Sequence, residues 1–220
     1  MAKFFKDNGL TITLMLLFLL SIVGQWLAGM HFENEQLIEH GKEPIGALQF
    51  LSDPQFLSTV FENWESEFLQ MSAYVVLTAF LFQRGSAESE DPDEPSRDGR
   101  LENARFAPNA PAPVRKGPAA RWLYAHSLGI ALLVLFAISF VLHWLFSARL
   151  AADEAALHGG TADTFGQYLA SPQLWFESFQ NWQSEFLSTA VLVVLSIWLR
   201  QKDSPESKQI TASNRKTGTD

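Results

Sequence analysis

The sequence predicts an all-α membrane protein, a four-span transmembrane helical bundle made of two tandem, parallel-repeat helical hairpins. Three observations lead to this fold class. Apolar residues make up 47% of the 220 residues and lie in four blocks, with nearly all the charge between the blocks. The second half of the chain repeats the first at a fixed shift. The Lys and Arg residues gather on one side of the predicted membrane.

The first span of each hairpin is predicted from length and charge. Residues 10–30 and 122–147 contain no Lys, Arg, Asp or Glu, and a helix of about 20 apolar residues crosses a bilayer. Lys3 and Lys6 before the first segment resemble the start of a signal peptide. That segment is longer than a typical signal peptide core, however, and its counterpart lies in mid-chain. We therefore expect a retained helix.

The repeat is visible in the polar residues as well as in the apolar ones. The stretch Asn-Trp-Glu-Ser-Glu-Phe-Leu at 63–69 recurs as Asn-Trp-Gln-Ser-Glu-Phe-Leu at 181–187, a shift of 118 residues. At this shift residues 8–89 align with 126–207 without a gap, and 30 of the 82 positions are identical. Two unrelated apolar helices would not share their polar loop positions, so the match indicates duplication.

The second span of each hairpin is shorter and is predicted at about 64–83 and 182–201. Arg84 and Lys202 follow the apolar runs and are expected to be interfacial anchors. About 20 residues earlier lie Trp64 and Trp182, where tryptophans of the aromatic belt are typical. The repeated motif then lies at the outer membrane boundary.

Helix-end signals extend these spans into longer helices. Pro54 and Pro172 fit the first turn of a helix, and Gly41 and Gly159 fit the residue that ends one. The sequence therefore predicts helices at 8–40 and 54–83, and at 122–158 and 172–201. Residues 47–51 and 165–169 in the connectors fit either a short surface helix or a plain loop.

Basic residues predict the topology. Fourteen of the 16 Lys and Arg residues lie at the N-terminus, at 84–121 or at 200–220, which places both termini in the cytoplasm. The outer loops at 31–63 and 148–181 then face the periplasm, and the chain is a multi-pass protein of a bacterial inner membrane. The hairpins cover 1–84 and 122–202. The linker at 85–121 and the tail at 203–220 are rich in Pro, Ser and charge and are expected to be disordered.

Polar residues near the outer boundary form a candidate site. Polar groups inside spans are costly and often functional. The candidate cluster combines residues of both hairpins: Gln25, Asn63, Glu67, His143, Asn181 and Glu185. A histidine and two carboxylates could relay protons or bind a cation. The alternative is structural, with the Trp at the headgroups, the Glu in water and the amides packing helices together.

Other chemistry is excluded or weakly indicated. There is no Cys, and the net charge of −8 argues against nucleic-acid binding. His40 and His158 precede the helix-ending glycines, where capping of the helix C-terminus is favoured over metal ligation. No phosphate-binding loop, His-Glu-x-x-His, Ser-x-x-Lys or haem pattern occurs. We expect no enzymatic activity, no cofactor and no metal site.

The motif around 61–70, with Val23-Gly24-Gln25, His40-Gly41 and the Gln-Arg-Gly-Ser-Ala-Glu-Ser stretch at 83–89, resembles an uncharacterised family of small bacterial four-helix membrane proteins. The resemblance covers nearly the whole chain apart from the linker and the tail. The family is a domain of unknown function, so the resemblance implies membrane location and no activity. The second copy departs from the pattern at His143 and Gln183.

The sequence therefore favours a non-enzymatic interaction or accessory protein in the lipid bilayer. Its expected partner is a membrane or periplasmic protein or a second copy of the chain. The alternative is a small cation or proton permease that uses the candidate cluster.

Overall fold

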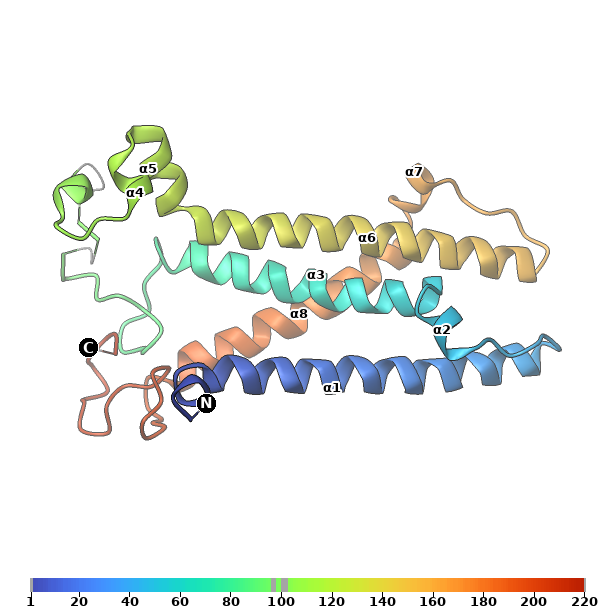
Figure 1. Ribbon diagram of the computed structural model, residues 1–220, viewed down its shortest axis with the longest axis horizontal. Coiled ribbons are helices and arrows are strands. Elements are labelled where there is room, and N and C mark those ends of the chain that lie inside the picture. The colour runs from blue at the N-terminus through green and yellow to red at the C-terminus, as the bar shows by residue number, and fades with distance from the viewer. Residues whose placement is uncertain (1, 96–97, 100–102, 220) are drawn as a thin grey trace. The chain divides into compact units, whose positions relative to one another are not determined.

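The computed structural model describes residues 2–95, 98–99 and 103–219, and these ranges contain helices and irregular connections but no strand. The helices are α1 (Ala2–Glu39), α2 (Ala47–Phe50), α3 (Pro54–Leu77), η1 (Asn103–Phe106), α4 (Ala112–Arg115), α5 (Pro118–Ala125), α6 (Ser127–Leu157), α7 (Phe165–Tyr168) and α8 (Pro172–Leu195) (Figure 1). They belong to two compact units. Unit one holds Met1–Val60 and His143–Phe165, and unit two holds Phe61–Leu142 and Gly166–Asp220.

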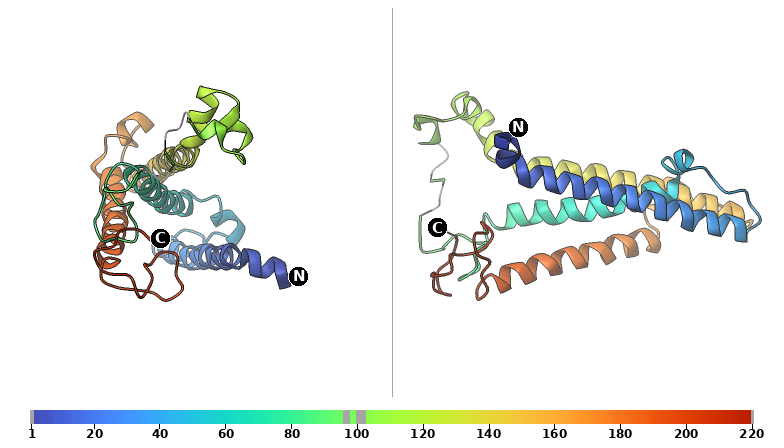
Figure 2. Two further views of the ribbon diagram at one scale, coloured as in Figure 1. Left: turned by 90° about the vertical axis from the view of Figure 1, so that its left-hand side faces the viewer. Right: turned by 60° about the horizontal axis from the view of Figure 1, so that its bottom comes forward.

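Helix α1 is long, apolar and exposed. No residue of its most apolar stretch is buried, and Leu10 and Leu20 are 76% and 70% exposed. Its first turns bend away from the rest of the helix (Figures 1 and 2). Near the start of α1 the Asn8 Nδ2 donates to the Phe4 carbonyl at 3.0 Å, and Gly9 follows it, where glycine weakens a helix locally.

Helices α3 and α8 have equal lengths of 24 residues. Both begin at a proline, as the sequence predicts. Gln55 N donates to the Asp53 carboxylate at 2.9 Å, and Leu174 N donates to the Ser171 hydroxyl at 3.3 Å. These side chains satisfy amide groups that the first turn of a helix leaves without a backbone partner.

Both helices end earlier than predicted, at Leu77 and Leu195 rather than at 83 and 201. Beyond these residues the backbone tightens into turns with bonds to the third residue back. Phe80 N bonds to Leu77 O at 3.0 Å, and Trp198 N bonds to Leu195 O at 3.1 Å. The apolar run continues through these turns, so hydropathy did not reveal where the helix stops. The predicted helix at 122–158 is likewise divided, at His126, into α5 and α6.

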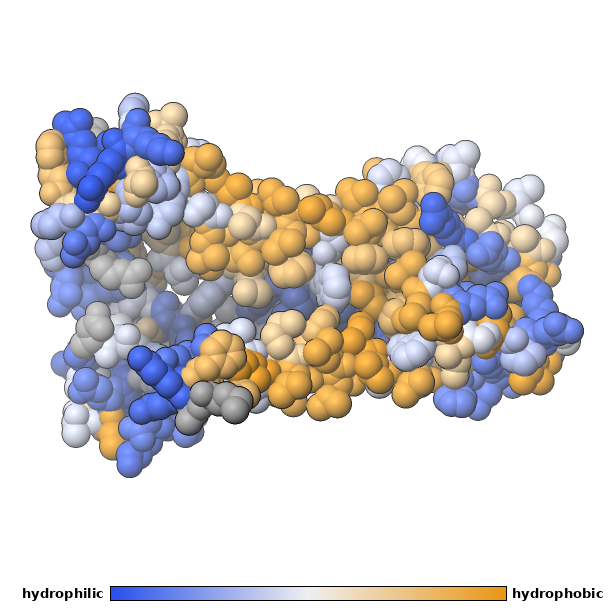
Figure 3. Space-filling model, viewed as in Figure 1, coloured by the Kyte–Doolittle hydropathy of each residue, from blue (hydrophilic) through white to orange (hydrophobic). Residues whose placement is uncertain are grey.

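Two helices, over Lys3–Glu39 and Ser127–Leu157, are long and apolar enough to cross a membrane. On the visible face apolar side chains gather over the middle stretches of both, and hydrophilic side chains are frequent toward the ends (Figure 3). Among the described residues α3 and α8 do not meet the same criterion, because the repeated motif places charged and amide side chains in their first halves. The four predicted spans thus reduce to two that composition supports directly.

The connector segments at 47–51 and 165–169, for which a short helix and a plain loop were both possible, contain the short helices α2 and α7. The indole Nε1 of Trp26 donates to the Ala47 carbonyl at 2.8 Å, and that of Trp144 donates to the Phe165 carbonyl at 3.0 Å. Phe50 of α2 is 1% exposed and lies against Gly29, where a Cβ would meet its ring at 3.0 Å. The connector that holds α2 is therefore fastened to α1, and the connector that holds α7 is fastened to α6.

The linker and the tail, which composition led us to expect as disordered, contain folded segments. Helices η1 and α4 lie within 85–121 and α5 begins there, and the Arg121 guanidinium donates to the Val114 carbonyl at 2.9 Å. The tail folds around Lys208, which is 2% exposed. Backbone carbonyls, rather than an apolar core, surround the Lys208 ammonium.

The glycines at the ends of α1 and α6 should be costly to replace. Gly41 and Gly159 have φ angles of 72° and 69°, and a side chain in this left-handed region costs about 1–2 kcal/mol. We expect Gly41→Ala and Gly159→Ala each to lower the free energy of unfolding by that amount, measured by thermal unfolding in detergent. Gly46→Ala is the control, since Gly46 has a φ of −77° and open space around it. An equal loss in the control would contradict the prediction.

Candidate functional site

A row of polar side chains joins α3 to α8 within unit two, and we call it the polar seam. Asn181 Nδ2 donates to Glu62 Oε1 at 2.5 Å, and Trp182 Nε1 donates to Glu65 Oε1 at 2.8 Å. One turn further along, Gln70 Nε2 donates to the Thr189 hydroxyl. In Figure 1 α8 passes behind α3 and crosses it at an angle, and Figure 2 gives two further views of the pair. Hydrogen bonds, and not apolar contacts alone, therefore hold them together.

The polar seam continues past the last turn of α3. The Tyr74 hydroxyl donates to Glu88 Oε2 at 2.6 Å. The Ser86 and Ser196 hydroxyls lie 2.8 Å apart, and Ala87 N donates to Ser196 at 3.1 Å. The segment after α3 thus folds back onto the end of α8, and the polar seam reaches the residues that follow both helices.

An acidic cavity of about 690 Å³ lies at this end of the polar seam. Its ionisable lining residues are Tyr74, Glu88, Glu90, Asp91, Glu94, Asp98, Glu206 and Lys216. Six carboxyl groups against one lysine make a negative field that attracts cations. Tyr74 and Glu88 belong to both the cavity and the polar seam.

Trp182 is held by protein on several sides. Its ring lies edge-on to Phe136 at 6.2 Å, to Phe179 at 5.4 Å and to Trp175 at 6.4 Å, measured between ring centroids. Such edge-to-face pairs stabilise beyond the area they bury. Together with its bond to Glu65, this cluster fixes the indole in one orientation. Trp64, its counterpart, lies edge-on to Phe61 at 5.5 Å.

The predicted site residues of unit two differ in their exposure to solvent. Asn63 and Glu67 are exposed, whereas Asn181 and Glu185 are half-buried. Asn181 joins the polar seam through Glu62. Glu185 accepts the Thr189 hydroxyl through its backbone carbonyl at 3.0 Å. The anchors Arg84 and Lys202 are exposed, and Arg84 pairs with Asp93 at 2.6 Å.

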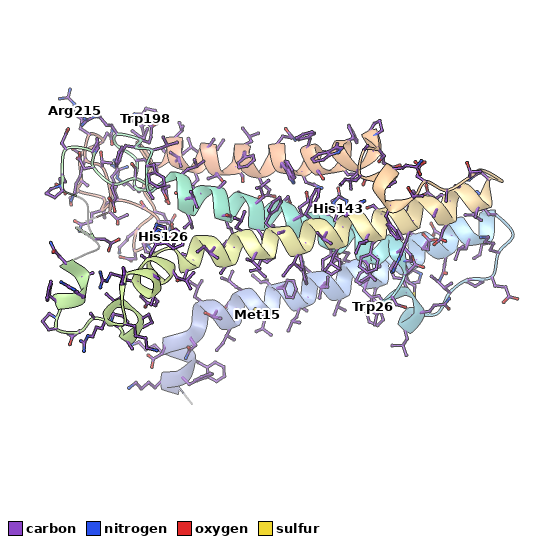
Figure 4. All side chains as sticks on the ribbon, turned by 90° about the horizontal axis from the view of Figure 1, so that it is seen from above. Met15, Trp26, His126, His143, Trp198 and Arg215 are labelled. Carbon is purple, nitrogen blue, oxygen red and sulfur yellow. The ribbon has the colours of Figure 1, made fainter. Side chains whose placement is uncertain are left out.

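The other two predicted residues lie in unit one. Gln25 Nε2 donates to the Thr59 hydroxyl at 3.2 Å, which ties α1 to the first turns of α3. His143 has no exposed surface and lies near the middle of α6 (Figure 4). It is the most deeply buried histidine of the described residues.

Sequence reasoning missed Glu62 and Glu65. Glu65 has no exposed surface and Ser66 is 2% exposed. Glu62, Ser66 and Gln70 follow one another at intervals of four, so they lie on one face of α3. The sequence contains that spacing, but the repeat favours Glu67, because a glutamate recurs at the equivalent position 185 whereas 65 and 183 differ.

The connector end of unit one carries acidic groups with raised pKa values. Burial raises the pKa of Glu33, and the carboxylates of Asp53 and Glu154 raise it further, whereas the Lys42 ammonium lowers it. Burial also raises the pKa of Asp53, with Asp153 adding to the shift and the bond from Gln55 opposing it. The folded chain therefore holds these protons at a pH where the unfolded chain has lost them.

Stability should consequently fall as the pH rises through this range. A raised carboxyl pKa favours the folded state in acid, and that contribution is lost at neutral pH. We expect thermal unfolding to occur at a higher temperature at mildly acidic pH than at neutral pH. Glu33→Gln should raise stability at neutral pH and flatten the dependence, and Glu43→Gln, at an exposed position, should do neither. Stability that rises with pH in the wild type would contradict this assignment.

Among the described residues no group of three or more His, Asp and Glu side chains converges to hold a metal ion. Neither the polar seam nor the connector end of unit one therefore forms a closed metal centre of protein ligands. The chemistry that the polar seam offers is hydrogen bonding between carboxylate, amide, indole and hydroxyl groups.

A family model described as a domain of unknown function (DUF6766) matches residues 1–219. The chain belongs to this family. The match includes the linker and the tail, so it extends beyond the part that the resemblance in sequence covered. No curated protein and no solved structure matches the chain. That description assigns the family no activity.

Proposed function

We propose that the chain is an integral membrane protein of two tandem hairpins that acts as a non-enzymatic interaction or accessory protein. The observation that carries the proposal is the reversed burial along α6. Three of its five buried residues are polar, namely Ser139, His143 and Ser147. Leu128, Leu133 and Ile138 on the same helix are more than half exposed. Water disfavours this arrangement, whereas a bilayer favours it.

Helices α8 and α1 support the same reading. Ser178 of α8 is 1% exposed, whereas Phe176 and Leu187 are 68% and 62% exposed. On α1, Met15 is 51% exposed and its side chain points away from the helix (Figure 4). Exposed apolar surface on this scale marks contact with lipid or with another protein.

Duplication is supported by elements and bonds that recur at the 118-residue shift. The bounds of α2 and α3 plus 118 are those of α7 and α8. The indole bonds of Trp26 and Trp144 recur in the same way. So do the bonds from Gln83 N to Ser89 and from Gln201 N to Ser207, both at 2.9 Å. In a parallel repeat both hairpins insert with the same orientation.

The proposed topology has four spans, with both termini and the linker in the cytoplasm of a bacterium. Because the chain has no Cys, single cysteines can report on it in intact cells. Leu48→Cys and Thr161→Cys in the outer loops should react with a membrane-impermeant maleimide. Ala107→Cys and Ser213→Cys should react only after lysis. The proposal would be refuted if all four positions were labelled in intact cells, or if washing the membranes with alkaline carbonate released the chain from them.

The interaction role follows from the exposed α1. Its apolar surface must be covered by lipid, by a second copy of the chain or by another membrane protein. Photocrosslinking from α1 in native membranes, followed by purification in mild detergent, tests this. We expect one stoichiometric protein partner or a crosslinked dimer. Crosslinks to lipid alone would remove the interaction role and leave membrane insertion standing.

The second candidate is a small proton or cation permease, which the polar seam and the acidic cavity favour. Chains of polar side chains that include carboxylates relay protons in membrane proteins. The chain reconstituted in liposomes should then conduct protons. Glu62→Gln and Glu67→Gln with Glu185→Gln should reduce that flux without preventing insertion. Absence of flux in the wild type, or equal flux in the variants, would exclude this function.

A further inference from the structure

The C-terminal ends of α1 and α6 in unit one have the same construction. Lys42 N bonds to Leu37 O at 2.8 Å, and Gly160 N bonds to Ala155 O at 2.8 Å. With the left-handed Gly41 and Gly159 these bonds make Schellman motifs, which satisfy the last carbonyls of a helix. The residue just before each glycine is a histidine.

Each histidine is held in one tautomer by its own helix. His40 Nδ1 lies 2.8 Å from the Gln36 carbonyl oxygen, and His158 Nδ1 lies 2.9 Å from the Glu154 carbonyl oxygen. A carbonyl only accepts, so Nδ1 carries the hydrogen in both rings. In the neutral imidazole Nε2 then bears the lone pair. A backbone bond of this kind is what orients histidine ligands in metal sites.

The two rings meet. Their centroids lie 6.3 Å apart with the planes at 80°, and both side chains are exposed. Two imidazoles on one ion place their centroids roughly 5–6.5 Å apart, since the Zn–N distance is about 2.0–2.1 Å. The observed separation corresponds to a nearly linear N–metal–N angle, so binding in the tetrahedral geometry of zinc requires the exposed rings to approach each other by about 1 Å.

The surroundings are acidic. The Asp53 and Glu154 carboxylates act electrostatically on Glu33, and Asp153 acts on Asp53, whereas Lys42 opposes them at Glu33. The net negative field raises the local concentration of cations. Among the described residues no group of three or more His, Asp and Glu could hold a metal ion. None of these carboxylates therefore joins the two histidines as a third ligand.

We propose that His40 and His158 together bind one divalent transition-metal ion of the Zn²⁺ and Cu²⁺ class through their Nε2 atoms. Imidazole nitrogen is a preferred ligand of these ions. Water completes the coordination, so the ion is exchangeable and binds more weakly than in a structural zinc site. The bound ion joins the C-terminal ends of α1 and α6. The proposal does not depend on the proposed function, because it concerns other residues.

The test is calorimetric titration of purified, chelator-treated full-length protein in detergent with Zn²⁺. We expect one ion per chain, with binding weakened in mild acid because protons compete for the ligands. Loss of a group that merely supports a metal ligand costs about 10–100-fold in affinity. His40→Ala and His158→Ala, each removing a ligand, should therefore lower affinity at least about tenfold. Cu²⁺ bound to the wild type should show two equivalent nitrogen couplings by electron paramagnetic resonance.

His126→Ala is the matched control. His126 Nδ1 lies 2.8 Å from the Trp122 carbonyl oxygen, so it makes the same bond to its own helix. Its ring stacks on Trp122 at 4.6 Å between ring centroids, not on a second histidine. The control should bind Zn²⁺ as the wild type does. The proposal is overturned if the wild type binds no ion, if His40→Ala with His158→Ala binds unchanged, or if only one of the two histidines matters.

Discussion

Replacing Glu65 with alanine is expected to destabilise the contact between α3 and α8 by about 2 kcal/mol. The bond from Trp182 to Glu65 contributes roughly 0.6 kcal/mol if it resembles other hydrogen bonds between membrane helices. The remainder comes from the cavity left by a fully buried side chain. Unfolding in detergent, followed by tryptophan fluorescence, measures both the loss and the release of Trp182.

Two variants distinguish the bond from a general effect of charge. Glu65→Gln keeps an oxygen at the acceptor position and should retain most of the stability. Glu67→Ala removes a carboxylate from the same motif at an exposed position and should change stability by less than about 0.5 kcal/mol. If Glu67→Ala were the more damaging change, the assignment of the polar seam to Glu62 and Glu65 would be wrong.

Replacing Lys208 with methionine is expected to release the tail. The Lys208 ammonium donates to the carbonyls of Gly85 and Lys216, the second at 2.9 Å, and to those of Ile197 and Asn214 at 3.3 Å. Hydrogen bonds to a charged group contribute about 1.5–3 kcal/mol each. Methionine fills the space without donating, so we expect a local loss of at least about 3 kcal/mol.

Hydrogen–deuterium exchange locates that loss. Amides at 85–89 and 208–218 should exchange about a hundredfold faster in Lys208→Met, since 1.4 kcal/mol is a factor of ten. Those of α6 should be unchanged. Lys202→Met is the control, because the Lys202 side chain is 75% exposed. Unchanged exchange in the tail of Lys208→Met would show that Thr217, which accepts from Gly85 N at 3.0 Å, is sufficient to hold it.

Local signals in the sequence were reliable where the cause is local. Pro54 and Pro172 marked the starts of α3 and α8, because proline fits the first turn of a helix. Gly41 and Gly159 marked the ends of α1 and α6, because only glycine adopts a positive φ without strain. Hydropathy identified the two helices that are long and apolar enough to cross a membrane.

The ends of α3 and α8 and the folded tail depend on long-range contacts. Leu77 and Leu195 are followed by residues just as apolar, so nothing in the composition marks a stop. In the structure Ser196 bonds to Ser86 and Ala87, which lie more than a hundred residues earlier. Lys208 similarly finds one of its carbonyl partners, Gly85, more than a hundred residues earlier in the chain. A sequence window does not contain these partners.

The amino-acid order thus specified the apolar blocks, the helix caps and the relative angles of side chains around each helix, because these depend on neighbours within a few residues. Tertiary packing decided which face of α3 meets α8, and hence that Glu62 and Glu65 rather than Asn63 and Glu67 join the polar seam. It also brought together His40 and His158, which follow α1 and α6. Helical periodicity sets the angles between side chains around one helix. Which of those side chains faces a neighbouring helix depends on the tertiary packing.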